Sequence, residues 1–223
     1  MAEPEKEYGV VTVCAGQGMS DLFRELGADR VVTGGQTMNP STDDILREIN
    51  RTPASTVFVF PNNKNIIMAA EQCVPLTEKK VIVMPSKTVP QGITALLNFD
   101  GDCGEQQLVE TMSAAMENVH TAQVTYAARD SDFDGHVIHA GEYLALLNGA
   151  LLGSYTNLKT LFKELCWALG DLEPEFITLY YGEDVTEEEA QKSASRLSDF
   201  FPDTEVSVVN GGQPVYYYML SVE

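Results

Sequence analysis

TVFVFPNNKNIIMAA, residues 56–70, places a short apolar run, a polar turn and a helix-like apolar segment directly after one another. The same plan occurs three more times in the first hundred residues. Its apolar runs lie at 10–14, 31–32 and 80–84, and the helix-like segments that follow them lie at 21–26, 41–49 and 91–97. Short apolar strands that alternate with helices are typical of a parallel sheet covered by helices. We therefore predict a parallel α/β lobe over residues 8–104.

A helix and a hairpin are predicted next along the chain. Apolar residues at helical spacing predict a linking helix over 106–119. A hairpin is expected within 143–152, because the pair Asn148-Gly149 suits a type I′ turn, in which both central residues need a positive φ. Further strands are predicted at 123–128, 137–140, 176–181 and 205–209, and helices at 158–169 and 186–200.

The end of the chain is expected to form one more hairpin. It would turn at Gly211-Gly212 and return through 215–222. With this hairpin, residues 105–223 are predicted to form a linking helix and a mixed-sheet α+β lobe. The fold class is therefore α/β, with a parallel-sheet half followed by a mixed-sheet half.

The chain of 223 residues is strongly acidic, with a formal net charge of −19 at pH 7. Such a charge repels nucleic acid and anionic lipid surfaces. Part of the acid is concentrated at 183–189, where it suits the start of a helix and could also attract a basic partner. No run of about 18 apolar residues is present, and residues 1–7 do not resemble a signal peptide. We expect a cytoplasmic protein without a membrane span, with its four cysteines as free thiols.

Polar loops follow the four predicted parallel strands. In an open parallel sheet, ligands bind beyond the carboxyl ends of the strands, where backbone amides and helix N-termini converge. Amide, hydroxyl and two lysine side chains in these loops suit an anionic or hydrogen-bonding ligand or a partner. The candidate residues are Gly34, Gly35, Gln36, Thr37, Asn39, Ser41, Thr42, Asn62, Asn63, Lys64, Asn65, Lys87, Thr88 and Gln91.

Helix capping is the competing interpretation of the same loops. Asn39 before Pro40 would make an N-cap followed by proline at the first helical position. Ser41 with Asp44 has the spacing of a capping box. The concentration of asparagines around Lys64 is greater than one cap requires, and it favours a binding role.

No catalytic or metal site is predicted. Asp130, Asp132 and Asp134 match the opening of a calcium-binding loop, but Gly141 stands where that loop needs a glutamate, so a hairpin turn is expected instead. His136 and His139 would point to opposite faces of a strand and make a poor pair of metal ligands. Phosphate-loop and nucleophile-elbow motifs are missing from the sequence.

Long phrases of this sequence resemble those of one protein family. They are GGQTMNPSTDDI at 34–45, PNNKNII at 61–67, TVPQG at 88–92 and GGQPVYYY at 211–218, with Arg129-Asp130 and Asp134-Gly135 between them. From about Tyr8 onward the chain closely resembles the C-terminal domain found in the A component of bacterial fatty acid kinase. This family is also described as dihydroxyacetone-kinase-like.

The resemblance implies a DegV-like two-lobed fold, shared with fatty-acid-binding proteins. In that family an N-terminal kinase domain binds ATP and magnesium, and a middle domain supports assembly. The partner is a separate acyl-carrying protein that presents a fatty acid carboxylate for phosphorylation. The 223 residues match neither the kinase nor the middle domain, so this piece is expected to bind no cofactor and to catalyse no reaction alone. Its implied role is to dock the acyl carrier for the kinase domain.

Other interpretations stay open beside this one. The loops with Lys64 and Lys87 could instead make a domain that binds a small anion or a carboxylate ligand. An independent enzyme is disfavoured, because three scattered histidines supply no recognisable pair of nucleophile and base. The tyrosines at 216–218 alternate across the last strand, so one face could be core and the other the interface of a homodimer.

Overall fold

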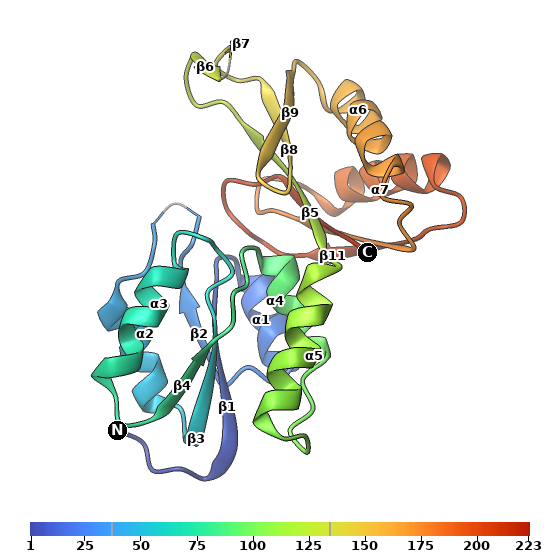
Figure 1. Ribbon diagram of the computed structural model, residues 1–223. Coiled ribbons are helices and arrows are strands. Elements are labelled where there is room, and N and C mark those ends of the chain that lie inside the picture. Colours follow the sequence, from blue (N-terminus) through green and yellow to red (C-terminus); the bar gives the residue numbers. More distant parts are fainter. Residues whose placement is uncertain (37, 134) are drawn as a thin grey trace. The chain divides into compact units, whose positions relative to one another are not determined.

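The computed structural model describes residues 1–36, 38–133 and 135–223. The chain divides into two compact units, Met1–Val119 and His120–Glu223, which are coloured from blue to green and from green to red in Figure 1. Each unit is built around its own sheet. Among the described residues, no helix combines the length and the apolar character needed to cross a membrane.

The first unit contains a parallel four-stranded sheet in the order β2-β1-β3-β4. Its strands are β1 Lys6–Cys14, β2 Arg30–Thr33, β3 Ala54–Phe60 and β4 Lys80–Val83. The two central strands are buried on both faces, which explains why their sequences are continuous apolar runs rather than alternating ones. All four strands lie where the sequence predicts them.

Helices cover both faces of this sheet. They are α1 Gln17–Glu25, α2 Thr42–Arg51, α3 Ile67–Cys73 with the short 3-10 helix η1 Val74–Leu76, α4 Val89–Leu97 and α5 Glu105–Glu117. Figure 1 shows α2 and α3 on one face and α1, α4 and α5 on the other. Ile45 and Ile49 of α2 are fully buried against Val57 and Val59 of β3 in one hydrophobic cluster.

The expected boundary between residues 104 and 105 differs from that of the structure. Helix α5 packs against α4 and belongs to the first unit, so the division falls after Val119. Leu108, Met112 and Met116, on one stripe of α5, are all at most 4% exposed. The apolar spacing that predicts this helix also marks the face by which it joins the first unit.

The second unit contains a mixed six-stranded sheet in the order β11-β10-β12-β5-β8-β9. Its strands are β5 His120–Tyr126, β8 Tyr143–Leu147, β9 Ala150–Tyr155, β10 Phe176–Tyr181, β11 Glu205–Asn210 and β12 Tyr218–Val222. Helices α6 Leu158–Gly170 and α7 Glu187–Phe200 pack on it, and β6 Ser131–Phe133 pairs with β7 His136–Ile138 in a separate two-stranded ribbon. Only β10 and β11 are parallel neighbours in the six-stranded sheet.

Of the two hairpins expected in this unit, one is confirmed and one is wrong. Asn148 and Gly149 have φ values of 51° and 82° and join β8 to β9, as the turn type requires. The final hairpin does not form, because β10 lies between β11 and β12 and pairs with both. Burial explains the insertion: all five residues of β12 are buried, which suits a central strand and not an edge.

The aspartate-rich segment forms a ribbon, as expected. Phe133 pairs with His136, and the backbone N–H of Gly135 donates a hydrogen bond to Oδ1 of Asp132. Asp134, the third aspartate of the suspected calcium loop, lies outside the described residues. Among those described, no group of three acidic, histidine or cysteine side chains is arranged to hold a metal ion.

Candidate functional site

The carboxyl ends of β1 and β3 mark the topological switch point of the first sheet. The chain leaves β1 toward β2 on one side and then crosses to β3 on the other. The loops that follow β1 and β3 therefore diverge, which in open α/β sheets opens a crevice for ligands. This is the place at which the sequence predicts a binding site.

Asn62, the second residue after β3, closes much of that crevice. Its side-chain Nδ2 donates hydrogen bonds to Thr12 Oγ1 at 2.8 Å and to the Val13 carbonyl at 2.9 Å, both on β1. Its backbone N–H donates to Ser86 Oγ, in the loop after β4, at 3.0 Å. Asn62 is 6% exposed and has a φ of 55°, in the left-handed region that asparagine tolerates better than most residues. It ties three neighbouring strand ends together.

The first turn of α4 packs directly on the Asn62 amide. A Cβ at Gly92 would overlap the Oδ1 and Cγ atoms of Asn62, so only glycine allows the helix to approach this closely. Asn62 Oδ1 is buried and has no hydrogen-bond partner among the described residues. The amide is therefore held by its Nδ2 donor and by shape.

Asn63 connects the loops after β2 and β3. Its Nδ2 donates to the Gly35 carbonyl at 2.6 Å, and its Oδ1 accepts from the backbone N–H of Asn65 at 2.9 Å. Gly34 and Gly35 have φ values of 149° and 97°, and a Cβ at Gly34 would lie 2.8 Å from the Met38 carbonyl oxygen. The two glycines are required by the backbone path of this turn.

Several other candidate residues begin helices or brace them. Ser41 is the N-cap of α2 and forms a capping box with Asp44, which confirms that part of the capping interpretation. The Ser41 hydroxyl and N–H donate to the Asp44 carboxylate and hold its pKa below the ordinary value. The expected N-cap at Asn39 is wrong: α2 begins at Thr42, and Asn39 is exposed two residues before the cap.

The start of α4 is braced in the same way. Thr88 is the N-cap, and its hydroxyl accepts from the Gln91 N–H at 3.3 Å. Gln91 Oε1 accepts from the Lys87 N–H at 2.8 Å, while its Nε2 donates to the Met116 carbonyl of α5 at 3.3 Å. Thr42, at the start of α2, donates to Gln72 Oε1 at 3.0 Å.

Few polar side chains in these loops are therefore available to a ligand. Lys64, Asn65 and Lys87 are exposed, and neither lysine forms an ion pair with a described residue. Gln36 Oε1 is buried and accepts no hydrogen bond from the part of the chain that the structure describes. Thr37 lies outside the described residues. The asparagine concentration noted in the sequence thus joins loops to one another, and Lys64 and Lys87 remain as exposed cations at this edge.

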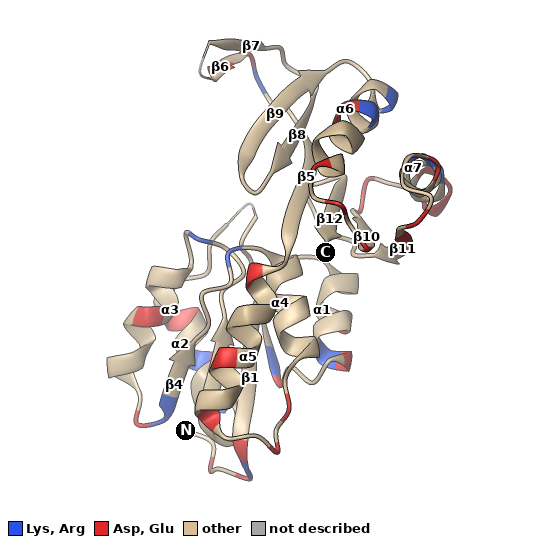
Figure 2. Ribbon diagram, turned by 45° about the vertical axis from the view of Figure 1, so that its right-hand side comes forward, with Lys and Arg blue, Asp and Glu red and all other residues tan. Residues whose placement is uncertain are grey.

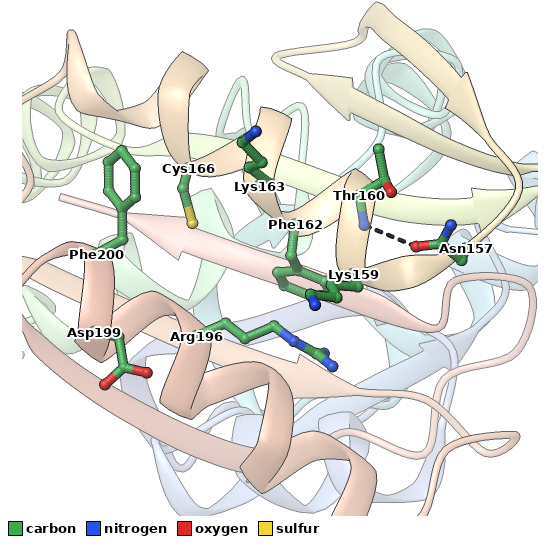
Figure 3. Close-up of a pocket in the computed structure, with 9 residues that line it drawn as sticks. All are labelled: Asn157, Lys159, Thr160, Phe162, Lys163, Cys166, Arg196, Asp199 and Phe200. Carbon is green, nitrogen blue, oxygen red and sulfur yellow. Dashed lines mark hydrogen bonds between the residues drawn. The ribbon is translucent and has the colours of Figure 1, made fainter.

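A second concave feature, missed by the sequence analysis, lies between α6 and α7 in the other unit (Figure 3). This α6–α7 cleft has a volume of about 620 Å³. It is lined by Asn157, Lys159, Thr160, Phe162, Lys163 and Cys166 from α6 and its cap, and by Arg196, Asp199 and Phe200 from α7. A signal was present in the sequence, because Lys159 and Lys163 are four residues apart and share a helix face.

Comparison with known proteins identifies the family of the chain. The family model for the C-terminal domain of FakA-like fatty acid kinase proteins matches residues 9–223. The chain belongs to this family. Protein YloV of Bacillus subtilis is 42% identical to this FakA-like C-terminal domain over 221 residues, which are 99% of the chain and 40% of YloV. The domain thus spans about two fifths of the length of the curated relatives it matches.

Solved structures show that the domain has the DegV fold. A fatty-acid-binding DegV family protein from Thermus thermophilus has a TM-score of 0.67 at 15% identity, covering 97% of this chain and 99% of that one. The Fak B3 protein of Streptococcus pneumoniae, loaded with linoleic acid, has a TM-score of 0.64 at 12% identity, with the same coverage. The predicted α/β class and DegV-like architecture of the FakA-like C-terminal domain are thereby confirmed.

Proposed function

We propose that this domain docks a protein that carries a fatty acid, and that it presents the acyl carboxylate to a kinase domain elsewhere in the parent protein. The observation that carries the proposal is the family match over residues 9–223, in relatives more than twice the length of the chain. Docking raises the effective concentration of a bound carboxylate at a kinase site without any chemistry in the docking domain. We assign ATP, magnesium and acyl phosphate formation to the parent protein outside this domain.

The distribution of charge supports a binding role. Acidic residues are spread over both units and gather on α7 and the loop before it (Figure 2). Glu187, Glu188 and Glu189 form the first turn of α7, where Thr186 and Glu189 make a capping box. Glu183 and Asp184 stand exposed just before it. A surface of one sign attracts a basic patch on a partner and speeds their encounter, most strongly at low salt.

A second function is favoured by the two exposed lysines at the strand ends. Lys64 and Lys87 follow β3 and β4, which are neighbours in the sheet. Free ammonium groups at such an edge suit a carboxylate or phosphate ligand. In this case Lys64→Ala or Lys87→Ala would abolish stabilisation by the ligand and leave the fold intact, whereas Lys192→Ala on α7 would serve as the matched control.

Calorimetric titration distinguishes the two functions. The chain is titrated with the fatty-acid-loaded carrier protein of the same organism, with ATP and free fatty acid as parallel titrants. We expect heat with the carrier alone, and weaker binding as salt rises. Silence with the carrier, together with saturable binding of a small anion that requires Lys64 or Lys87, would replace docking by the second function.

A further inference from the structure

Two stripes of side chains run along the α6–α7 cleft. Lys159, Lys163 and Trp167 follow one another at intervals of four residues, so they lie along one side of α6. Arg196 and Phe200 have the same spacing on α7. All of them except Trp167 line the cleft itself, and Trp167 stands against Phe200 at its end. In both stripes the cations come first and the aromatic ring comes last.

The apolar contact surface of the cleft lies at its aromatic end. Trp167 is 63% exposed and Phe200 is 38% exposed, and the two rings stand edge to face with 5.5 Å between their centroids. Phe162 and Cys166 beneath them are 0% and 2% exposed, so an occupant would meet the two rings and not the floor. Tryptophan is mostly buried in folded proteins and is enriched among the residues that dominate protein interfaces. The exposed pair of rings therefore suits one apolar anchor of a partner.

The cations of the cleft are available to an acidic group. Lys159, Lys163 and Arg196 form no ion pair with a described residue, whereas Lys192, also on α7, pairs with Glu188 at 2.7 Å. These three are the majority of the five Lys and Arg side chains in residues 120–223. Lys159 also lies in the first turn of α6, where the helix dipole adds partial positive charge. Carboxylates are therefore the groups that complement this part of the cleft.

An acidic amphipathic helix of a partner protein has the spacing to complement the α6 stripe. Its carboxylates, four residues apart, would meet Lys159 and Lys163, and an apolar residue one turn further would meet Trp167. The stripe from Lys159 to Trp167 extends over eight residues, about 12 Å, which is just over two turns of such a helix. The carboxylate of Asp199 lies at the other end of the cleft from Lys159 in Figure 3, so it does not oppose an acidic group there.

Other occupants are disfavoured by the charge of the whole chain. A formal net charge of −19 repels nucleic acid, and it repels a second copy of the chain, which carries the same charge. A partner whose acidic residues are confined to one helix meets the local cations of the cleft without this overall repulsion.

We propose that the α6–α7 cleft docks an acidic amphipathic helix of a partner protein, with carboxylates at the cations of α6 and an apolar side chain against Trp167 and Phe200. In this mode of recognition a helix lies in a groove and is read through anchors at helical spacing. The cleft takes the opposite chemistry from the acidic start of α7, which suits a basic patch. The proposal is therefore independent of the docking function above, and either can fail without the other.

The test titrates the intact chain with synthetic helical peptides of about 15 residues. The probe peptide carries two glutamates four residues apart and a leucine four residues further, on a background rich in alanine and glutamine. Trp167 fluorescence follows binding, and isothermal calorimetry gives the affinities. We expect saturable binding of the probe, and about tenfold weaker binding when both glutamates are replaced by glutamine or when the leucine is replaced by alanine. Salt raised from about 50 mM to about 500 mM should weaken binding of the probe, because it screens exposed charges.

Variants locate the site. Lys159→Gln combined with Lys163→Gln should weaken binding of the probe about tenfold and leave binding of the glutamine peptide unchanged. Lys192→Gln removes a cation of α7 that does not line the cleft, and it should change neither. Trp167→Ala, measured by calorimetry, should abolish the preference for leucine over alanine. Circular dichroism confirms that each variant is folded.

Several results would overturn the proposal. These are no binding of the probe, equal binding of the glutamate and glutamine peptides, or normal binding of the probe by the double lysine variant. A dimer that Trp167→Ala dissociates in size-exclusion chromatography would also overturn it, since a second copy would then cover the cleft. So would phosphatidylglycerol vesicles that bind through Lys159 and Lys163 while the probe does not, because the cleft would then face a membrane.

Discussion

Replacing Asn62 tests whether this residue holds the strand ends together. Asn62→Ala removes the Nδ2 donor of two buried hydrogen bonds. The acceptors, Thr12 Oγ1 and the Val13 carbonyl, then each lose the hydrogen bond from this donor. Each loss costs about 1 to 1.5 kcal/mol. Alanine at a φ of 55° adds about 1 kcal/mol of backbone strain. Removal of the unpaired Oδ1 offsets part of this sum. We expect the free energy of unfolding of the first unit to fall by about 2 to 3 kcal/mol.

Urea denaturation supplies the measurement. Far-UV circular dichroism follows both units, while Trp167 fluorescence reports on the second unit, which contains it. The Asn62→Ala change should therefore shift the transition of the first unit. Asn65→Ala is the matched control, because the Asn65 side chain is exposed and forms no hydrogen bond to a described residue, while its backbone N–H donates to Asn63. It should change stability by less than about 0.5 kcal/mol.

A double-mutant cycle isolates the hydrogen bond itself. Thr12→Val removes the acceptor hydroxyl and keeps the branched shape, and the pair Asn62→Ala with Thr12→Val should show a coupling energy of about 1 kcal/mol. The reasoning is refuted if Asn62→Ala costs no more than Asn65→Ala, or if the coupling energy is zero within error. Either result would mean that the Asn62 amide is not what joins β3 to β1.

Three further predictions concern other parts of the chain. Gly92→Ala should destabilise the first unit by about 1 to 3 kcal/mol in urea, because its Cβ would overlap the Asn62 amide; a neutral effect would show that α4 can shift away. Because the folded-state pKa of Asp44 is lowered, its contribution to stability is present above its unfolded pKa and is lost as the pH falls below about 4. Asp44→Asn should therefore flatten the dependence of the melting temperature on pH between about 5 and 2.5, and an unchanged slope would contradict the capping box. Cys103, the partly exposed thiol, should react with iodoacetamide at pH 8 before Cys14, whose pKa burial raises to about 12; peptide mass spectrometry of the native protein would detect the reverse order.

Sequence patterns predicted where the helices and strands of this fold lie more successfully than they predicted which strands pair with one another. The apolar runs and their following helices located the strands of the first sheet, since each depends on residues that are neighbours along the chain. Asn148-Gly149 located a turn for the same reason. The position of β12 between β10 and β5 depends on residues up to about a hundred positions apart, so a local pattern could not reveal it and a simple hairpin was wrongly expected.

The two candidate sites also combine features that the sequence could predict with features that it could not. The described loop residues follow the strands of the first sheet, yet the sequence could not distinguish an asparagine that binds a ligand from one that bonds to a neighbouring strand. Asn62 donates a hydrogen bond to Thr12, which is 50 residues away along the sequence, and the two residues meet only in the folded chain. The α6–α7 cleft combines residues of two helices, so the spacing of Lys159 and Lys163 could indicate one shared face of α6 but not the cleft itself.

The sequence by itself determined the alternation of strands and helices, the capping box at Ser41, the Asn148-Gly149 turn and the acidic character of the surface, because each follows from residue type and short-range spacing. Tertiary structure alone decided that α5 belongs to the first unit, that β12 is a central strand, that Asn62 and Gly92 close the switch point, and that Lys159, Lys163 and Arg196 line one cleft between α6 and α7. The physical reason is that burial and hydrogen bonding are satisfied between segments distant along the chain, and the choice among the segments that could satisfy them is made only when they pack together.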